Sequence, residues 1–410
     1  MRRVARRCWI EGATGGDCPI EHLPFATFDR TGERSRLGVA IGNRVCDLAR
    51  LAADGLLDVP DGGTDLDVLL AAGPVAWSEL RAGLTDLLTD GHARPRVEPH
   101  LLPGATCRPR LPFTVADYVD GYASLEHATN LGRILRPDQE PLLPNWRHLP
   151  VAYHGRAGSV VVSGTPVHRP TGQLGVRGGQ VRFGPTERLD FELEVGFVVG
   201  VPSEPGTALT PAEAVRHLFG LVLLDDWSAR DIQAWEYQPL GPYLGKSFAT
   251  SIAAWVTPMA ALGDCWVDGP LQEPAPLPHL ATGEPSGLDI ELDVTLRAGG
   301  VETVLTRTNL RHLYWRIGQQ LAHATSNGAG LRRGDVFATG TVSGPTPGSE
   351  GSLMELSWGG TRSVPLADGS ERRFLADGDG VVLGGRVRSG DVSFRLASCR
   401  GTVVGARPVS

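Results

Sequence analysis

Residues 189–197 read LDFELEVGF, a run in which apolar side chains alternate with acidic ones. A period of two is the pattern of a β-strand, so the apolar side chains share one face while Glu192 and Glu194 share the other. The next two residues, 198 and 199, are valines, which makes both faces apolar and indicates that the strand ends inside the protein. The stretch therefore predicts a strand-rich fold that buries acidic side chains.

Two interpretations fit the glutamate pair. On a solvated sheet face, Glu192 and Glu194 would be ordinary polar residues without a function. In the interior, two like charges about 7 Å apart repel each other and are costly to remove from water unless a cation lies between them. Carboxylate oxygens suit Mg²⁺ or Ca²⁺ better than zinc. The strand thus predicts either a polar surface or one half of a metal site.

The most apolar run of the chain, residues 218–224 (LFGLVLL), ends in Asp225 and Asp226. A buried strand that ends in an acid can present a metal ligand at the edge of a sheet. An aspartate at this place is equally natural as the cap of the helix that we expect from residue 227 onward. Because two acids are adjacent, both interpretations can hold at once.

On that helix, Arg230, Gln233 and Tyr237 recur at helical spacing and form a polar stripe opposite Trp235. A solvated face accounts for such a stripe in many helices. Arginine, glutamine and tyrosine alone are an unusual choice for that purpose, so a functional face remains the alternative.

A second candidate stretch, residues 117–135, places Asp120 and His127 seven positions apart. The two would share nearly one face of a helix, although Gly121 delays a helix start. A lone histidine is more often a structural hydrogen-bonding residue than a base. Arg136 and the segment 153–156 (YHGR) follow, and arginine and tyrosine bind carboxylates well in partly buried pockets. These residues predict a clamp for a carboxylate.

Lys246 is the only lysine among the 39 Lys and Arg residues of the chain. Arginine serves as well on a surface, so a lone lysine in this chain indicates a place where a compact ammonium must fit. The segment 241–247 (GPYLGKS) differs from a phosphate-binding P-loop, because three residues rather than four separate its first glycine from the Gly-Lys pair and a helix precedes it. We expect a functional role for Lys246 that does not involve nucleotide phosphates.

Composition excludes several classes of protein. A net charge of −7 offers no basic face to nucleic acid. The six cysteines form no C-x-x-C pair, which argues against zinc ribbons and thioredoxin-like sites. The apolar runs are too short to span a bilayer, and the basic start lacks the apolar stretch of a signal peptide. We expect a cytoplasmic enzyme with reduced thiols, no membrane and no nucleic-acid partner.

The 410 residues, with 53 glycines and 31 prolines, are too long for one small domain and too rich in helix breakers for a helical bundle. We expect two domains, 1–115 and 116–410, joined through the proline-punctuated segment 99–112. The first should contain strands at 24–28, 37–41 and 45–48 and helices around 66–72 and 77–88. The second should contain strands at 189–199, 288–296 and 354–358 and helices at about 115–135, 227–237 and 308–326. Few strands alternate with long helices, so a β-rich roll or barrel is favoured over a doubly wound sheet.

Short motifs follow one another along nearly the whole chain. They are LGVAIG (37–42), DYVD (117–120), EHATN (126–130), LPNW (143–146), HLPV (148–151), YHGR (153–156), DWSARDIQ (226–233), WEY (235–237), PLGP (239–242), GKSF (245–248) and ELSW (355–358). Their content and order resemble the fumarylacetoacetase family. So many motifs in one order are far more specific than any single short pattern.

The resemblance implies a β-rich α+β fold with a small SH3-like N-terminal barrel and a C-terminal mixed β-sandwich roll that holds the active site. It also implies a homodimer. The implied reaction is the metal-dependent hydrolysis of the carbon–carbon bond of 4-fumarylacetoacetate, a diketo acid, to fumarate and acetoacetate in tyrosine and phenylalanine catabolism. Mg²⁺, Ca²⁺ or both would be the cofactor.

The resemblance also assigns roles to individual residues. The metal ligands would be Asp120, Glu192, Glu194 and Asp226, with Lys246 and Thr250 at a second cation position. His127 would be the general base and Glu355 would orient it, while Arg230, Gln233 and Lys246 would stabilise oxyanion charge. Substrate would contact Tyr122, Arg136, Tyr153, Gln233, Tyr237 and Thr341. We expect Glu355 to lie on a strand.

Two departures from the family pattern keep other functions open. Gly121 stands where an aromatic residue is expected, and Leu125 and Glu126 replace a more polar or basic pair. A looser pocket wall at Gly121 would suit a hydrolase of another acylpyruvate or β-dicarbonyl. An isomerase, hydratase or decarboxylase of oxo acids could use the same metal scaffold. A non-catalytic relative would have lost metal ligands, and all four are present.

Overall fold

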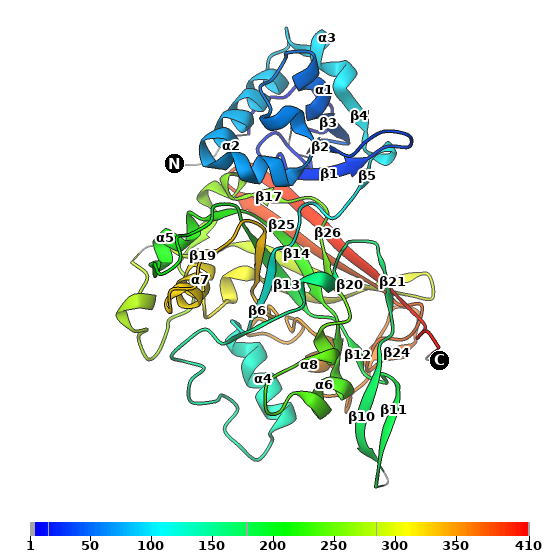
Figure 1. The fold of residues 1–410 in the computed structure, drawn as a ribbon. Helices are drawn as coiled ribbons and strands as arrows, with labels where there is room; N and C mark the ends of the chain where they lie inside the picture. The colour runs from blue at the N-terminus through cyan, green and yellow to red at the C-terminus, as the bar shows by residue number, and fades with distance from the viewer. Residues whose placement is uncertain (1–4, 15, 178, 284, 409–410) are drawn as a thin grey trace.

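The computed structural model describes residues 5–14, 16–177, 179–283 and 285–408, and its strands form two large sheets and a smaller N-terminal one (Figure 1). The sheets are joined by short helices and long loops, with strands more numerous than helices. This architecture confirms the predicted mixed, strand-rich fold. Within these residues, no helix combines the length and the apolar character needed to cross a membrane, and all six cysteines are free thiols.

The N-terminal sheet has the strand order β4-β3-β2-β1-β5. Its strands are β1 (Phe25–Asp29), β2 (Arg36–Ile41), β3 (Arg44–Asp47), β4 (Leu101–Pro103) and β5 (Arg108–Pro109). The helices α1 (Leu48–Ala53), α2 (Leu66–Thr89) and α3 (Arg94–Val97) accompany it. The three predicted strands are confirmed. The two predicted helical stretches are also confirmed. They are the two parts of α2, which is interrupted at Gly73, whose φ is 82°.

The expected linker at 99–112 is wrong in part, because this segment contributes β4 and β5 to the N-terminal sheet. The two strands lie at the two edges of that sheet. Proline cannot donate a ladder hydrogen bond, and an edge strand is where a sheet tolerates it, so Pro103 and Pro109 are compatible with strands here. The prolines that suggested a linker instead mark sheet edges.

The central sheet runs in the order β7-β6-β22-β13-β14-β16-β8, and β17 also pairs with β14. Its strands are β6 (Asp117–Gly121), β7 (Ala152–His154), β8 (Val160–Val162), β13 (Leu193–Val199), β14 (Leu218–Asp226), β16 (Thr250–Ile252), β17 (Thr257–Pro258) and β22 (Asp335–Ala338). Every residue of β13 and β14 is buried. The acid-bearing strand and the most apolar run are therefore neighbours at the centre of the protein, as their sequences suggest.

The second large sheet has the order β21-β20-β25-β26-β9 and packs against β14. It consists of β9 (Pro166–His168), β20 (Ile290–Ala298), β21 (Val301–Asn309), β25 (Gly380–Ser389) and β26 (Val392–Val404). Two-stranded pairs complete the fold: β10 (Thr171–Arg177) with β11 (Gln180–Pro185), β12 (Leu189–Asp190) with β15 (Ser228–Ala229), β18 (Trp266–Val267) with β19 (Gly287–Leu288), and β23 (Val364–Pro365) with β24 (Glu371–Arg372). The β10–β11 hairpin projects from the body of the protein (Figure 1).

The remaining helices are α4 (Leu125–Leu135), α5 (Pro211–Val215), α6 (Arg230–Glu236), α7 (Ile317–Thr325) and α8 (Leu353–Leu356). Three predicted boundaries need correction. Residues 117–121 form strand β6, and the helix expected at 115–135 begins only at Leu125, after its cap Ser124. The strand expected at 189–199 breaks between β12 and β13, and the helix expected at 308–326 is shortened to α7.

The strand predicted at 354–358 is wrong, because Glu355 lies on the short helix α8. Ser352 caps this helix by accepting a hydrogen bond from the Glu355 amide at 3.3 Å. A run of five residues with alternating apolar side chains is too short to separate strand from helix by its period. Likewise, neither Asp225 nor Asp226 caps the helix that follows them, since Ala229 occupies the cap position of α6.

The contact between β26 and Trp227 yields a test of packing between the two large sheets. Trp227 follows Asp226 directly and is fully buried, and a Cβ atom added at Gly401 would lie 2.2 Å from its ring. We expect Gly401→Ala to lower the free energy of unfolding by about 1–3 kcal/mol, because the ring and the strand must separate. Urea unfolding measures this change. Gly380→Ala is the control, because its Cβ would meet Arg297 at an ordinary 3.4 Å, and equal losses in both variants would contradict the expectation.

Candidate functional site

Four buried carboxylates meet at one point of the central sheet. They are Asp120, Glu192, Glu194 and Asp226, and each offers an oxygen within 4.8 Å of those of the others. Asp120 comes from β6, Glu194 from β13 and Asp226 from the end of β14, while Glu192 lies just before β13. All four predicted metal ligands are therefore brought together, and the buried interpretation of the glutamate pair is confirmed.

Strand pairing explains how residues far apart in sequence reach this point. The register between β13 and β14 sets Leu193 opposite Asp225, and the Asp226 amide donates to the Glu192 carbonyl at 3.3 Å. On the other side, β22 lies between β13, to which it is antiparallel, and β6, to which it is parallel, with Ala338 opposite Asp120. The proximity of Asp120 to His127 thus comes from a strand followed by a helix, and the shared helical face considered from the sequence is wrong.

The cluster carries more negative charge than its protein neighbours neutralise. Both carboxylate oxygens of Glu194 and Oδ1 of Asp120 are buried without a hydrogen-bond partner among the described residues. Burial, together with the charge of the neighbouring carboxylates, raises the pKa of Asp120 and of Glu194 well above the usual range. Unpaired buried oxygens of this kind are the ligands that a hard divalent cation takes. The residues present therefore fit a metal ion.

Two cations border one side of the cluster. Lys246 donates to Glu192 and, at 2.5 Å, to Asp226, and Arg230 Nη2 donates to Glu192 Oε1 at 2.7 Å. Burial would raise the pKa of Glu192, but these two cations outweigh it and hold that pKa well below its usual value. Burial would also lower the pKa of Lys246, but Asp226 and Glu192 raise it, so the ammonium stays charged. The only lysine thus lies between two of the candidate ligands.

Asp226 accepts further hydrogen bonds. Thr250 Oγ1 on β16 lies 3.2 Å from Asp226 Oδ1, and the Tyr153 hydroxyl on β7 donates to Oδ2 at 3.1 Å. Burial, reinforced by Asp120 and Asp226, raises the pKa of Tyr153 well above its usual value, so it remains a donor. Thr250 and Tyr153, both singled out in the sequence, lie directly beside the cluster.

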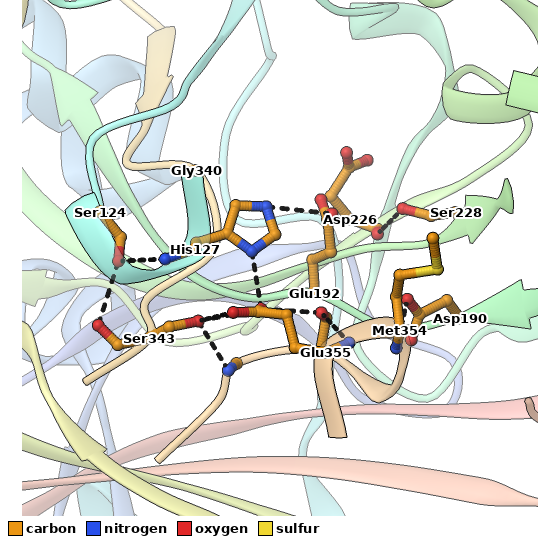
Figure 2. Close-up of polar contacts among 12 residues, drawn as sticks. Ser124, His127, Asp190, Glu192, Asp226, Ser228, Gly340, Ser343, Met354 and Glu355 are labelled. Atoms are coloured by element: carbon orange, nitrogen blue, oxygen red, sulfur yellow. Dashed lines mark hydrogen bonds and ion pairs between the residues drawn. The ribbon is translucent and has the colours of Figure 1, made fainter. Parts of the chain in front are cut away.

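His127 and Glu355 form a buried pair next to the cluster, with Nδ1 and Oε2 at 2.7 Å (Figure 2). Burial alone would raise the pKa of Glu355, but His127 and hydrogen bonds from Asn130 and Ser352 lower it, so the carboxylate is ionised. A proton on Nδ1 leaves Nε2 free, and Nε2 faces the cluster at 3.9 Å from Glu192. The Tyr122 ring meets the imidazole edge-on, with centroids 5.3 Å apart. The arrangement can accept a proton beside a metal site.

The other predicted residues differ in how they are connected to this core. Gln233 Oε1 accepts a hydrogen bond from Arg230 Nη1 at 3.2 Å, and Thr341 is buried with its hydroxyl unpartnered among the described residues. Arg136 ends α4 and donates to the Pro141 carbonyl at 3.0 Å. Tyr237 is 37% exposed, and its hydroxyl accepts from Gln238. Within the described part of the chain, no hydrogen bond ties Arg136 or Tyr237 to the cluster.

Sequence reasoning missed four residues that support the site. Glu355 is also bound by Asn130 at 3.0 Å, by Ser343 at 3.0 Å and by Ser352 at 2.8 Å, and Asp190 binds Arg230 at 2.8 Å. A signal existed for Asp190, because it shares the alternation of Glu192 and Glu194, and for Asn130, which follows His127 by three positions. Ser343 and Ser352 lie in loops, where no periodic pattern marks them.

Two family models match nearly the whole chain. Residues 117–404 match the fumarylacetoacetate (FAA) hydrolase C-terminal model, and residues 21–112 match the fumarylacetoacetase N-terminal model. The chain belongs to the fumarylacetoacetase family. It is 43% identical to the fumarylacetoacetase of Homo sapiens over 414 residues, covering 97% of this chain and 99% of the relative. It is 45% identical to that of Caenorhabditis elegans over 419 residues, covering 98% and 99%.

Solved structures share the fold at lower sequence identity. A fumarylacetoacetate hydrolase from psychrophilic Exiguobacterium antarcticum has a TM-score of 0.55 and 16% identity, covering 94% of this chain and all of that one. Maleylpyruvate hydrolase from Sphingobium sp. SYK-6, in complex with a manganese(II) ion and pyruvate, has a TM-score of 0.51 and 15% identity, with the same coverage. These similarities extend the match from sequence to architecture.

The unpaired carboxylates predict a measurable response to divalent cations. We expect Mg²⁺ or Ca²⁺ to raise the thermal unfolding midpoint, since a ligand at 100 times its Kd stabilises the folded state by about 2.7 kcal/mol. Glu194→Gln should remove most of this response and raise the midpoint in the absence of metal, because it relieves repulsion in the cluster. Thermal unfolding with and without each cation measures both effects. Glu204→Gln, at an exposed glutamate, is the control, and an undiminished response in Glu194→Gln would contradict the metal site.

Proposed function

We propose that this chain hydrolyses the carbon–carbon bond of 4-fumarylacetoacetate and releases fumarate and acetoacetate. The observation that carries the proposal is the buried His127–Glu355 pair, whose free imidazole nitrogen faces the four-carboxylate cluster. Identity of 43% to curated fumarylacetoacetases over nearly the full length supports the choice of substrate. The reaction would belong to tyrosine and phenylalanine catabolism.

Cleavage of a 1,3-diketone by water needs an activated water, a stabilised oxyanion and a leaving enolate. His127 takes the proton from water at Nε2, and Glu355 stabilises the imidazolium that results, a contribution of about 10²–10⁴-fold. Because Glu355 is buried and ionised, it also holds the imidazole in the orientation that leaves Nε2 free. The same histidine can return the proton to the leaving carbon.

Three donors surround the place where negative charge develops. Arg230, Gln233 and Lys246 are fixed by hydrogen bonds to Glu192, to Asp226 or to one another before substrate arrives. Preorganised donors of this kind contribute about 10²–10³-fold each. They hold the oxyanion while His127 moves the proton.

Asp120, Glu192, Glu194 and Asp226 would hold the cation, with Mg²⁺ or Ca²⁺ as the ions that match four carboxylate ligands. When bound, the cation would act as a Lewis acid toward the diketone oxygens. A second cation position would lie beside Lys246 and Thr250.

The substrate's carboxylates and carbonyls would be bound by residues around the cluster. Arginine and tyrosine recognise carboxylates through charge-assisted and directional hydrogen bonds. These residues would be Tyr122, Arg136, Tyr153, Gln233, Tyr237 and Thr341. Packing at Gly121 gives no support to a looser pocket, because an added Cβ would lie 2.7 Å from Gln320 Oε1 and 2.9 Å from the Ala338 carbonyl.

We further propose the organisation that the family suggests. Residues 1–115 would form an SH3-like barrel, and residues 116–410 would form a β-sandwich roll that carries all the catalytic residues. The active form would be a cytoplasmic homodimer. The separate N-terminal sheet and the two family models, which meet between residues 112 and 117, support this division.

Removal of the proposed base tests the reaction directly. We expect the chain to hydrolyse fumarylacetoacetate when Mg²⁺ or Ca²⁺ is present, and His127→Ala to lower kcat by about 10²–10⁴-fold because no other group accepts the proton at that place. Loss of the diketone absorbance measures the rate. His168→Ala, at an exposed histidine, serves as the control. Turnover that survives in His127→Ala would favour an isomerase or decarboxylase, and no turnover in the unmodified chain would refute the proposal.

Lys246→Arg tests whether the lone lysine has a function. We expect a loss of about 10²–10³-fold in kcat with the fold intact, because a planar guanidinium is larger than the ammonium held between Glu192 and Asp226. Steady-state kinetics and thermal unfolding measure the two properties. Arg297→Lys, the reverse change at an exposed position of β20, is the control. Near-normal turnover in Lys246→Arg would show that the lone lysine is a compositional coincidence.

A further inference from the structure

Asp190 is a buried carboxylate that belongs neither to the carboxylate cluster nor to the His127–Glu355 pair. It ends strand β12 and is 0% exposed. The pairing of β12 with β15 sets Asp190 opposite Ser228, two residues before Arg230. A carboxylate buried so completely is tolerated only if donors satisfy it, so its partners show what it holds in place.

The carboxylate of Asp190 is fully occupied by four donors. Oδ1 accepts a hydrogen bond from the amide of the next residue, Phe191, at 2.9 Å and another from the Leu353 amide at 2.8 Å. Oδ2 accepts from Arg230 Nε at 2.8 Å and from the Met354 amide at 3.1 Å. An ionised carboxylate offers about four acceptor sites, and here all are used.

These donors come from two parts of the proposed catalytic machinery. Arg230 bridges Asp190 and Glu192, because its Nη2 also donates to Glu192 Oε1 at 2.7 Å. Leu353 and Met354 begin helix α8, whose next residue is Glu355. Figure 2 shows Asp190 close to Met354 and Glu192, while Glu355 on the same helix reaches toward His127. One carboxylate thus connects the oxyanion side of the site to the side of the base.

We propose that Asp190 is a positioning residue that fixes the separation between Arg230 and the His127–Glu355 pair. The inference rests on the proposed function, because it assigns Arg230 to the oxyanion and His127 to the base. The side-chain hydrogen bonds of Asp190 go to Arg230 and to the amides of Phe191, Leu353 and Met354, so it acts through Arg230 and through the first turn of α8. A displacement of about 1 Å between the two sides would cost on the order of 10²-fold in rate.

Substitution by asparagine isolates this role. Asp190→Asn keeps the shape of the side chain, but its NH₂ group must face either the amides of Phe191 and Leu353 or Arg230 Nε and the Met354 amide, all of which are themselves donors. Asp190→Glu keeps the charge and the pairing chemistry, but one additional methylene displaces the carboxylate. A role in neutralising Arg230 would survive the second change, whereas a role in positioning would not.

Asp47 provides a matched control. It is also 0% exposed, caps helix α1 by accepting from the Arg50 amide at 3.2 Å, and pairs with Arg36 Nε at 3.1 Å. It lies on β3 of the N-terminal sheet, which contains none of the proposed catalytic residues. Asp47→Asn therefore removes a buried carboxylate bound to an arginine and to a helix start, without touching the site.

The test combines steady-state kinetics with a measurement that needs no substrate. We expect both Asp190 variants to lower kcat by about 10–100-fold at nearly unchanged KM, as loss of an outer-shell partner does, while Asp47→Asn lowers stability and keeps kcat. The ¹H NMR signal of the proton between His127 Nδ1 and Glu355 should shift in the Asp190 variants and stay in place in Asp47→Asn. If Asp190→Asn does not fold, Asp190→Glu carries both measurements.

The outcomes separate this inference from the proposed function. Wild-type kcat per folded molecule and an unshifted NMR signal in the Asp190 variants would overturn the positioning role. A normal kcat in Asp190→Glu alone would also overturn it, in favour of charge neutralisation. If the unmodified chain does not hydrolyse fumarylacetoacetate, the proposed function fails, and the NMR signal still decides whether Asp190 holds the His127–Glu355 pair.

Discussion

The structure depends on keeping several ionised groups in an interior that excludes water. Four carboxylates lie within 4.8 Å of one another, and Lys246 and Arg230 pair with one side of them, while the oxygens of Glu194 have no hydrogen-bond partner among the described residues. Such a centre is costly unless its charges are arranged in alternation and its open oxygens receive a cation. The strands around it are buried and apolar, because only a rigid, dry frame keeps like charges at fixed positions.

The carboxylates lie on strands or directly before one, whereas the proposed base and the hydrogen-bond donors come from helices. β13 and β14, in the middle of the strand order, supply carboxylates, while His127, Glu355 and Arg230 come from the helices α4, α8 and α6. Strands give fixed spacing to the groups that repel one another. Helix starts and loops bring in the groups that must transfer a proton or donate hydrogen bonds. Asp190 and Ser352 both hold the helix that carries Glu355, because each accepts a hydrogen bond from an amide of its first turn.

Much of this arrangement could be predicted from the sequence, and the exceptions have physical causes. Alternation in 189–197 and the apolar run before Asp226 located three of the four carboxylates, because burial leaves a periodic pattern. The spacing of Asp120 and His127 marked both as candidates, and the motif resemblance added Glu355 and the role of His127 as the base. The helix at Glu355 was missed because four residues carry no resolvable period, and β4 and β5 were missed because proline marks edges as well as linkers. Ser343 and Ser352 bind Glu355 through contacts that tertiary folding creates, which no local pattern encodes.

The parallel pairing of β6 with β22 has a consequence for how the protein reaches its active state. It sets Asp120, from the first third of the chain, beside residues 335–338 from the last third. Closing such a long loop is entropically costly and slow compared with forming local hairpins. The carboxylate cluster is therefore complete only after β22 has paired with β6. During synthesis, all four carboxylates leave the ribosome before β22, so the strand that sets Asp120 in place is the last strand of the central sheet to be made.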